Sequence, residues 1–501
     1  MALSWLLLLI CFILAYIGYK LFSSLWLLQN SGIQCPLPFP IVGNNCLRYK
    51  MGYMKFHEHL KKQHGPMPGF YLGHVPFLAV TDGDMLKQIM VKEFNCFPDR
   101  PLLALTKKGS APRGLLSARG EEWKTARHTL SPSFSAAKMK AMVPQIEKSV
   151  ETLADIFREQ ADSAESVNVC RIFGNYTMET ILMMAFGQSV DIQRGESDEI
   201  VEAARKIFLL SDERKSTFLV LVILPLMHAF PWLEFFLRFL VSQTQLAKYS
   251  KIISSVAKQL VRQRRNSPIP QKYKDLLQSM IEAIKDDQMK LTDEQIVAHS
   301  TTFLLAGYET TSNTLAYVSY LLALNPIIQE KLQQEIDNYF DNNPEAPPYE
   351  AAQEIEYLEK VIHETLRLHC PVGSILRYCQ KSTVLNGVTV PKGVIVDVPV
   401  YTIHKDPRYW PNPEVFDPER FSPEEKSKRP PLSYIPFGYG QRKCLGMRFA
   451  LLEAKLALIH LLRRFTFTQT PDTEVPLQVS IGMSVAPKNG IFLKIKRREH
   501  H

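Results

Sequence analysis

The 501-residue sequence has no Gly/Ser-rich linker, no internal repeat, no low-complexity run and no long block of like charge. Such features divide chains or mark disordered segments, so their absence favours one large folded domain. Hydrophobic residues make up 46% of the chain, which is ordinary for a globular protein. The formal net charge of +9 is spread along the whole length. It is too diffuse to indicate nucleic acid, so no nucleic-acid partner is expected.

The sequence also lacks any CxxC pair and any regular cysteine framework. Its eight cysteines lie at positions 11, 35, 46, 96, 170, 370, 379 and 444. This pattern argues against a disulfide scaffold and favours a reducing compartment.

Charge is absent from residues 2–19. An 18-residue helix at about 1.5 Å per residue spans roughly the hydrocarbon core of a bilayer, so this segment predicts an N-terminal transmembrane helix. The alternative is a cleaved signal peptide, but no Lys or Arg precedes the run and no small-x-small cleavage site follows it. Positive charge begins only at Lys20, which predicts that the large domain lies on the cytosolic side.

A proline-rich stretch follows the apolar segment. Pro36, Pro38 and Pro40 force an extended backbone and forbid helix continuation. We therefore expect an anchor over residues 1–28, a stiff hinge over 29–45 and one folded domain over 46–501.

The periodicity of apolar residues predicts a mainly α fold with a minor β region. Helical spacing occurs over residues 134–161, 243–265, 292–325, 327–340, 351–369 and 446–464. Short β-like runs occur near residues 69–80, 375–397 and 477–496.

The longest predicted helix runs from Thr292 to Asn325. A capping box of Thr292 and Gln295 opens it, Asn325-Pro326 closes it, and its length is about 50 Å. Its middle reads AGYETT, where Gly307 costs about 1 kcal/mol relative to alanine and the threonine hydroxyls can bond to the preceding turn. This weak point predicts a local bulge and a groove. The alternative is a helix kinked for packing.

One cysteine has unusual neighbours, in the stretch FGYGQRKCLG at residues 437–446. The three glycines allow sharp bends and the close approach of a flat group. A helix predicted from about Leu445 points its positive end at Cys444, and Arg442 and Lys443 add positive potential. This setting favours a thiolate, which acts as either a nucleophile or a metal ligand.

The residues near Cys444 help to decide between a nucleophile and a metal ligand. No histidine lies within the motif to serve as a base, and a lone thiolate is the wrong ligand set for tetrahedral zinc. Haem iron receives four ligands from the porphyrin and needs only one from the protein.

These residues resemble a known signature. FGYGQRKCLG matches FxxGxRxCxG, the haem-binding signature of the cytochrome P450 superfamily, with Phe437, Gly440, Arg442, Cys444 and Gly446 in place. Four further motifs follow the order of the same family across most of the chain. HETLRLH supplies a Glu-x-x-Arg pair, FDPERF an arginine, WKTAR a Trp-x-x-x-Arg pair and AGYETT the long-helix motif.

The resemblance implies the cytochrome P450 fold, a haem b cofactor and a role for each motif residue. Cys444 is the expected axial ligand of the haem iron. Glu364, Arg367 and Arg420 are expected to form a buried ion network that is structural. The residues expected at the haem are Trp123, Arg127, Arg377, Arg442, Phe437, Gly440, Gly446 and Ala306. Of these, Arg127, Arg377 and Arg442 are cations suited to the haem propionates, and Ala306 leaves room for a substrate.

Proton delivery is the remaining chemical requirement. Glu309 and Thr310 offer an acid and a hydroxyl in the middle of the long helix, and we expect them to be the catalytic residues. The alternative for Glu309 is an ordinary exposed helix acid.

A finer resemblance is to the animal clan that holds the family-3 drug-metabolising enzymes and thromboxane synthase. It is carried by RPLLALTKKG, by residues 217–240 and by the tail PDTEVPLQVSIGMSVAPKNGIFLKI. Because Thr310 is kept, the expected function is a monooxygenase acting on steroids, fatty acids or xenobiotics. The alternatives are an isomerase of a prostaglandin endoperoxide and a haem-dependent ligand binder without turnover.

A monooxygenase of this class needs electrons and an apolar substrate. The resemblance implies NADPH, used through NADPH–cytochrome P450 reductase, with cytochrome b5 as a further partner, on the endoplasmic reticulum membrane. Cations expected on the docking face are Lys124, Lys138, Lys140, Arg442 and Lys443, which otherwise form a solvated surface. Residues 217–232 predict a hydrophobic loop that dips into membrane lipid, or a buried core segment.

Overall fold

We describe the protein from a computed structural model. It describes residue 18 and residues 24–40, 42–101, 113–163, 165–195, 198–210, 243–266, 275–282 and 291–499. Residues 1–17 and 19–23 of the predicted anchor and the whole of the predicted loop at 217–232 lie outside these residues. Within the described part of the chain, no helix has both the length and the apolar character needed to cross a membrane.

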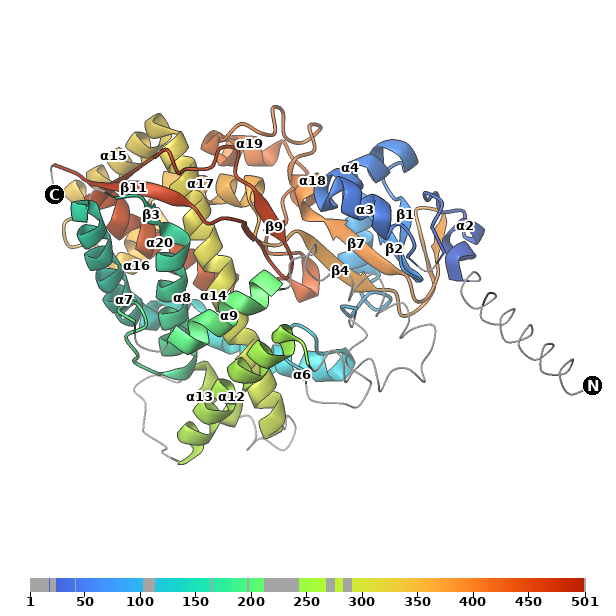
Figure 1. Ribbon diagram of the computed structural model, residues 1–501, viewed down its shortest axis with the longest axis horizontal. Helices are drawn as coiled ribbons and strands as arrows, with labels where there is room; N and C mark the ends of the chain where they lie inside the picture. The colour runs from blue at the N-terminus through green and yellow to red at the C-terminus, as the bar shows by residue number, and fades with distance from the viewer. Residues whose placement is uncertain are drawn as a thin grey trace, which may run out of the picture.

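The fold is mainly helical, as predicted. Figure 1 shows the helices gathered on one side and a small sheet, covered by α3 and α4, on the other. The longer helices are α4 (Tyr53–His64), α6 (Gly120–Leu130), α7 (Ala136–Ser163), α8 (Val169–Phe186), α9 (Asp198–Leu210), α12 (Gln245–Asn266), α14 (Asp293–Leu324), α15 (Pro326–Asn342), α17 (Glu356–Leu368) and α20 (Met447–Arg464). Shorter ones include α2 (Leu27–Asn30), α3 (Asn45–Met51), α5 (Gly83–Lys87), α13 (Leu276–Glu282), α16 (Pro348–Glu354), α18 (Val400–His404) and α19 (Pro423–Ser427).

The main sheet has the strand order β1-β2-β7-β4 and mixes both pairings. Strands β1 (Gly69–Leu72) and β2 (Val75–Ala79) form a hairpin, β2 runs parallel to β7 (Ile395–Pro399), and β4 (Ser374–Tyr378) is antiparallel to β7. Every residue of β7 is buried, as expected for a central strand. The smaller sheets are made of β3 (Val167–Asn168), β5 (Thr383–Leu385), β6 (Val388–Val390), β8 (Phe465–Thr468), β9 (Val479–Ile481), β10 (Val485–Pro487) and β11 (Phe492–Arg497).

Helix α14 crosses the helical part of the molecule, with α8 beside it (Figure 1). Its predicted capping box is present, because the Thr292 hydroxyl accepts from the Gln295 amide and the Gln295 side chain accepts from the Thr292 amide. The predicted bulge at Gly307 is wrong, since α14 is a continuous α-helix there. A Cβ at Gly307 would lie 2.8 Å from the Ile181 side chain of α8. The glycine is required for close helix packing.

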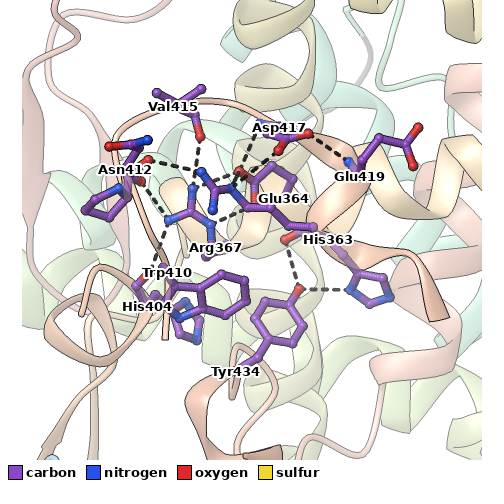
Figure 2. Close-up of polar contacts among 12 residues, drawn as sticks. His363, Glu364, Arg367, His404, Trp410, Asn412, Val415, Asp417, Glu419 and Tyr434 are labelled. Carbon is purple, nitrogen blue, oxygen red and sulfur yellow. Dashed lines mark hydrogen bonds and ion pairs between the residues drawn. The ribbon is translucent and has the colours of Figure 1, made fainter. Parts of the chain in front are cut away.

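The predicted ion network is present and is shown in Figure 2. Arg367 binds Glu364 through two bonds of 2.7 Å, and Arg420 lies 3.4 Å from the same carboxylate. Arg367 also donates to the carbonyl oxygens of His404, Pro413 and Val415. The network therefore ties α17 to the irregular segment that follows α18.

That segment leads into the cysteine stretch. The Tyr434 hydroxyl donates to the carbonyl of His363 on α17 (Figure 2). The amide of Ile435 donates to the ring of His404. Trp410 donates to the carbonyl of Ser433 and lies under the Arg367 guanidinium. The fold thus fixes the chain immediately before Phe437.

Candidate active site

A cavity of about 330 Å³ lies between α6, α14, β4, the cysteine stretch and the start of α20. Its wall is mainly apolar and includes Leu115, Phe303, Val372 and Ile375. Cys444 and Thr310 line the same cavity. The fold therefore places the predicted iron ligand, Cys444, and the predicted proton-delivery residue, Thr310, in one cavity although they are 134 positions apart in the sequence.

The cysteine stretch is a tight loop held by its own backbone. The amide of Cys444 donates to the carbonyl of Phe437 at 2.8 Å, and α20 begins at Met447. Gly440 has a φ of +73°, and a side chain there would overlap the carbonyl oxygen of Met90. This glycine is thus required by the close approach of the helical turn Gln88–Lys92, which contains Met90. Phe437 and Gly446 line the cavity, whereas Gly440 does not.

The pKa of Cys444 differs from the sequence-based expectation. The Cys444 thiol lines the cavity, and desolvation by the surrounding protein raises its pKa, while the amides of Gly446 and Met447 and the guanidiniums of Arg100 and Arg127 act to lower it. The amides at the start of α20 act in the predicted sense, but the cations that lower this pKa are Arg100 and Arg127 and not the predicted Arg442 and Lys443, and desolvation outweighs all of these groups. Metal coordination deprotonates a thiol, so a bound iron would hold Cys444 as the thiolate.

Cations gather around the cavity. Arg442 is buried, lies 4.3 Å over the Trp123 ring and donates to Asp99 at 3.0 Å. Arg127 donates to the carbonyl of Lys443 at 2.9 Å and so connects α6 to the cysteine stretch.

Arg377 extends this cluster from β4, where it is buried and donates to the carbonyl of Leu376. Arg100 also lines the cavity, a position that motif reasoning did not identify. Arg100 is the first residue of RPLLALTKKG, a stretch that indicates the finer family resemblance but no side-chain direction.

The arginine cluster has too few partners within the protein. The Nε atom of Arg377 and the Nε and Nη1 atoms of Arg442 have no hydrogen-bond partner among the described residues. Burial, with neighbouring arginines, lowers the pKa of Arg377 to about 9 and that of Arg442 to about 10. Buried cations of this kind call for an anionic ligand. The two propionates of a haem fit this requirement.

The protein ligands available for a metal at Cys444 also fit a haem iron. In the part of the chain that the structure describes, no group of three or more His, Cys, Asp or Glu side chains could hold a metal ion. Any metal at Cys444 must bring its other ligands with it, as haem iron does.

Helix α14 presents Ala306 and Thr310 to the cavity, and the Thr310 hydroxyl donates to the Ala306 carbonyl at 2.7 Å. Glu309 is not among the residues that line it. Its carboxylate accepts from Asn313 and Ser484, each at 3.3 Å, on a neighbouring face of the helix. Glu309 is buried, so the alternative of an exposed helix acid is wrong. Burial raises its pKa to about 7.

This shifted pKa predicts a pH-dependent stability. Because the folded pKa of about 7 exceeds the unfolded value of 4.5, the folded state binds this proton more strongly, and stability falls as the pH rises from about 4.5 to 7. Glu309→Gln should remove this part of the profile, which amounts to at most about 3 kcal/mol. Thermal unfolding between pH 5 and 8 tests it. Parallel profiles for wild type and variant would contradict it.

From the sequence, substrate contacts are expected from residues 106–116, Phe303, Ala306, residues 372–375 and residues 481–484. Leu115, Leu116, Phe303, Ala306, Val372 and Ile375 line the cavity, but no residue of 481–484 does. Ser484 instead donates to Glu309. Residues 102–112, where further contacts are expected, lie outside the described residues.

Comparison with known proteins agrees with this geometry. The family model described as Cytochrome P450 matches residues 33–495, so the chain belongs to the cytochrome P450 family. Cytochrome P450 3A9 of Rattus norvegicus is 36% identical over 509 residues, with 99% of this chain and 97% of the relative covered. Cytochrome P450 3A5 of Homo sapiens is 36% identical over 505 residues, with the same coverage. Cytochrome P450 3A29 of Sus scrofa is 37% identical over 502 residues, again with 99% and 97% covered.

The chain is therefore a cytochrome P450 monooxygenase, and its resemblance to the family-3 enzymes is confirmed. Family membership implies a haem iron cofactor, a redox partner and a lipophilic substrate.

Proposed function

We propose that the protein inserts one oxygen atom from O2 into lipophilic substrates such as steroids, fatty acids or xenobiotics. The observation that carries this proposal is the shared apolar cavity of Cys444 and Thr310. NADPH supplies the electrons through NADPH–cytochrome P450 reductase, with cytochrome b5 as a second donor. Residues 1–28 anchor the protein in the endoplasmic reticulum membrane, residues 29–45 form the hinge, and residues 46–501 form the cytosolic catalytic domain.

In this proposal the cavity holds haem b. A thiolate-ligated haem iron activates dioxygen and favours cleavage of the O–O bond. Cys444 supplies the iron ligand. Arg127, Arg377 and Arg442, with Arg100, hold the propionates, and Trp123 supports Arg442 from below its guanidinium plane.

Thr310 and Glu309 are the residues proposed to deliver the proton. The Thr310 hydroxyl lies at the cavity wall, where it can bond to the Ala306 carbonyl or to a water molecule. Glu309 remains the proposed acid, with a pKa of about 7 that permits both proton states near neutral pH. Because its carboxyl does not line the cavity, it must act through intervening groups.

The proposed reductase surface is smaller than the sequence predicts. Arg442 is buried, so its assignment to a docking face is wrong. Lys124 is ion-paired with Glu121, and Lys140 with Glu350. These exposed pairs contribute little and can yield to an acidic partner, and Lys443 is exposed beside Cys444.

Replacing Thr310 with alanine tests the monooxygenase reaction directly. Product formation should fall at least about tenfold while NADPH consumption continues, because the hydroxyl that orders proton delivery is lost. Both quantities are measured in the reconstituted system with reductase. Thr314→Ala is the matched control, since that hydroxyl also lines the cavity and bonds back along α14. Unchanged coupling in Thr310→Ala would contradict the proposed role of this hydroxyl in proton delivery.

The substrate class is tested with the haem-loaded protein in lipid. Steroids, fatty acids, small drugs and a prostaglandin endoperoxide are incubated with and without reductase and NADPH. Products that require electrons and carry an atom from labelled dioxygen support the proposal. Endoperoxide rearrangement without electrons, and no oxygenation of the other compounds, would contradict it.

A further inference from the structure

A second hollow, of about 280 Å³, lies at the opposite end of α20 from the cysteine stretch. We call it the arginine pocket, and its lining residues are Arg158, Arg463, Arg464, Phe465, Arg497 and Arg498. Helix α20 is 18 residues long, or about 27 Å, and the two cavities share no lining residue. The arginine pocket is therefore separate from the haem cavity.

The arginine pocket is lined by five cations, and no carboxylate is among the described residues that line it. Two of the arginines are fixed by structural bonds. Arg464 binds Glu151 at 3.2 Å, and Arg498 binds Asp337 as well as the carbonyl of Leu462 at the end of α20. These bonds hold the two side chains in place, and each guanidinium is paired with a carboxylate that does not line the pocket.

The other three arginines keep donors available. Arg158 and Arg497 pair with Asp155 and Asp162, but in each pair both side chains are between 42% and 60% exposed. Exposed pairs of this kind are worth little and can be replaced by a stronger partner.

Arg463 is the least satisfied member of the arginine pocket. Its guanidinium lies 4.1 Å over the Phe340 ring and makes no hydrogen bond or ion pair with the described residues. Arginine presents planar, paired donors that match phosphate oxygens. A hollow of this size suits a small, multiply charged anion better than a drug-sized ligand.

We propose that the arginine pocket binds a small phosphorylated ligand and recognises a diphosphate group. Arg463, Arg158 and Arg497 contact the phosphate oxygens, and Arg464 and Arg498 hold the wall in place. Free diphosphate, a nucleotide and a phospholipid headgroup all offer this phosphoryl chemistry, so the test must separate them.

The test is calorimetric titration of the haem-loaded full chain with inorganic pyrophosphate at constant ionic strength. We expect saturable binding that Arg463→Gln weakens at least about tenfold, because a charge-assisted contact is lost. Lys496→Gln is the matched control, since Lys496 is an exposed cation of β11 that does not line the pocket. It should change the affinity less than about twofold. Arg497→Gln provides an independent variant if Arg463→Gln fails to fold.

Competition identifies the source of the phosphoryl group. Displacement of pyrophosphate by ADP indicates a nucleotide, and displacement by short-chain phosphatidic acid indicates a lipid headgroup. If neither competes, free diphosphate is the ligand. An absence of saturable binding, or an equal loss in Arg463→Gln and Lys496→Gln, would overturn the proposal because it would show only diffuse attraction. The haem spectrum reports on the separate haem cavity throughout, so a failure here leaves the proposed monooxygenase function untouched.

Discussion

Replacing Cys444 with serine will abolish monooxygenase turnover and change the visible spectrum of the haem-loaded protein. Cys444 is the one cysteine among the described residues that line the cavity. Losing a residue that hydrogen-bonds to a metal ligand typically lowers metal affinity or activity by about 10–100-fold. Losing the ligand itself should therefore lower turnover by more than about 100-fold. Haem content per protein, the visible spectrum and product formation are measured together.

The fold itself should survive this change. The loop depends on the backbone bond from the Cys444 amide to the Phe437 carbonyl, which serine preserves. Cys46→Ser is the control, because that thiol is exposed on α3. It should leave all three measurements unchanged. A Cys444→Ser protein with wild-type spectrum and turnover would remove Cys444 from its proposed role as iron ligand.

Much of the fold could be predicted because its signals are local. The capping box and the Asn325-Pro326 stop define α14 almost to the residue. The predicted helix at 351–369 is instead two helices, α16 and α17, which meet at Ile355. Helices α4, α6 and α8 were not predicted as elements. Helix α8 is buried along most of its length, so it lacks the one-sided apolar stripe that reveals a surface helix.

Family motifs indicated several of the residues that line the cavity. They did not indicate side-chain directions or burial, because those depend on packing between distant parts of the chain. The resemblance to the family motifs indicated Arg127, Arg377 and Arg442, and all three line the cavity. Spacing gives no side-chain direction for Glu309, whose carboxyl turns to Ser484 near the C-terminus. The role of Gly440 depends on the Met90 carbonyl, about 350 positions away in the sequence. The pKa of Cys444 depends on burial, which a motif does not report.

Replacing Glu364 with alanine should give the largest loss of stability of any change to a described ion pair. The side chains of Glu364 and Arg367 are both 0% exposed, and the variant would leave the guanidinium buried without its carboxylate. Removing one partner of a buried pair costs about 3–5 kcal/mol. The amide of Asp417 would also lose its acceptor. We expect poor haem retention and a shorter half-life on heating, measured from the haem absorbance during incubation.

Two further variants test whether the loss of stability comes from the unpaired, buried Arg367 or from any change in this region. Glu419→Ala removes an exposed carboxylate that pairs with Lys331 and Lys360 nearby, and should cost less than about 1 kcal/mol. The double variant Glu364→Leu and Arg367→Met removes the unpaired charge but leaves the carbonyls of His404, Pro413 and Val415 without their donor. It should therefore lose less than the sum of the two single changes and still fall below wild type. A double variant as stable as wild type would mean that Arg367 only neutralises Glu364. Its three bonds to the segment before the cysteine stretch would then not be needed to hold the haem cavity in shape.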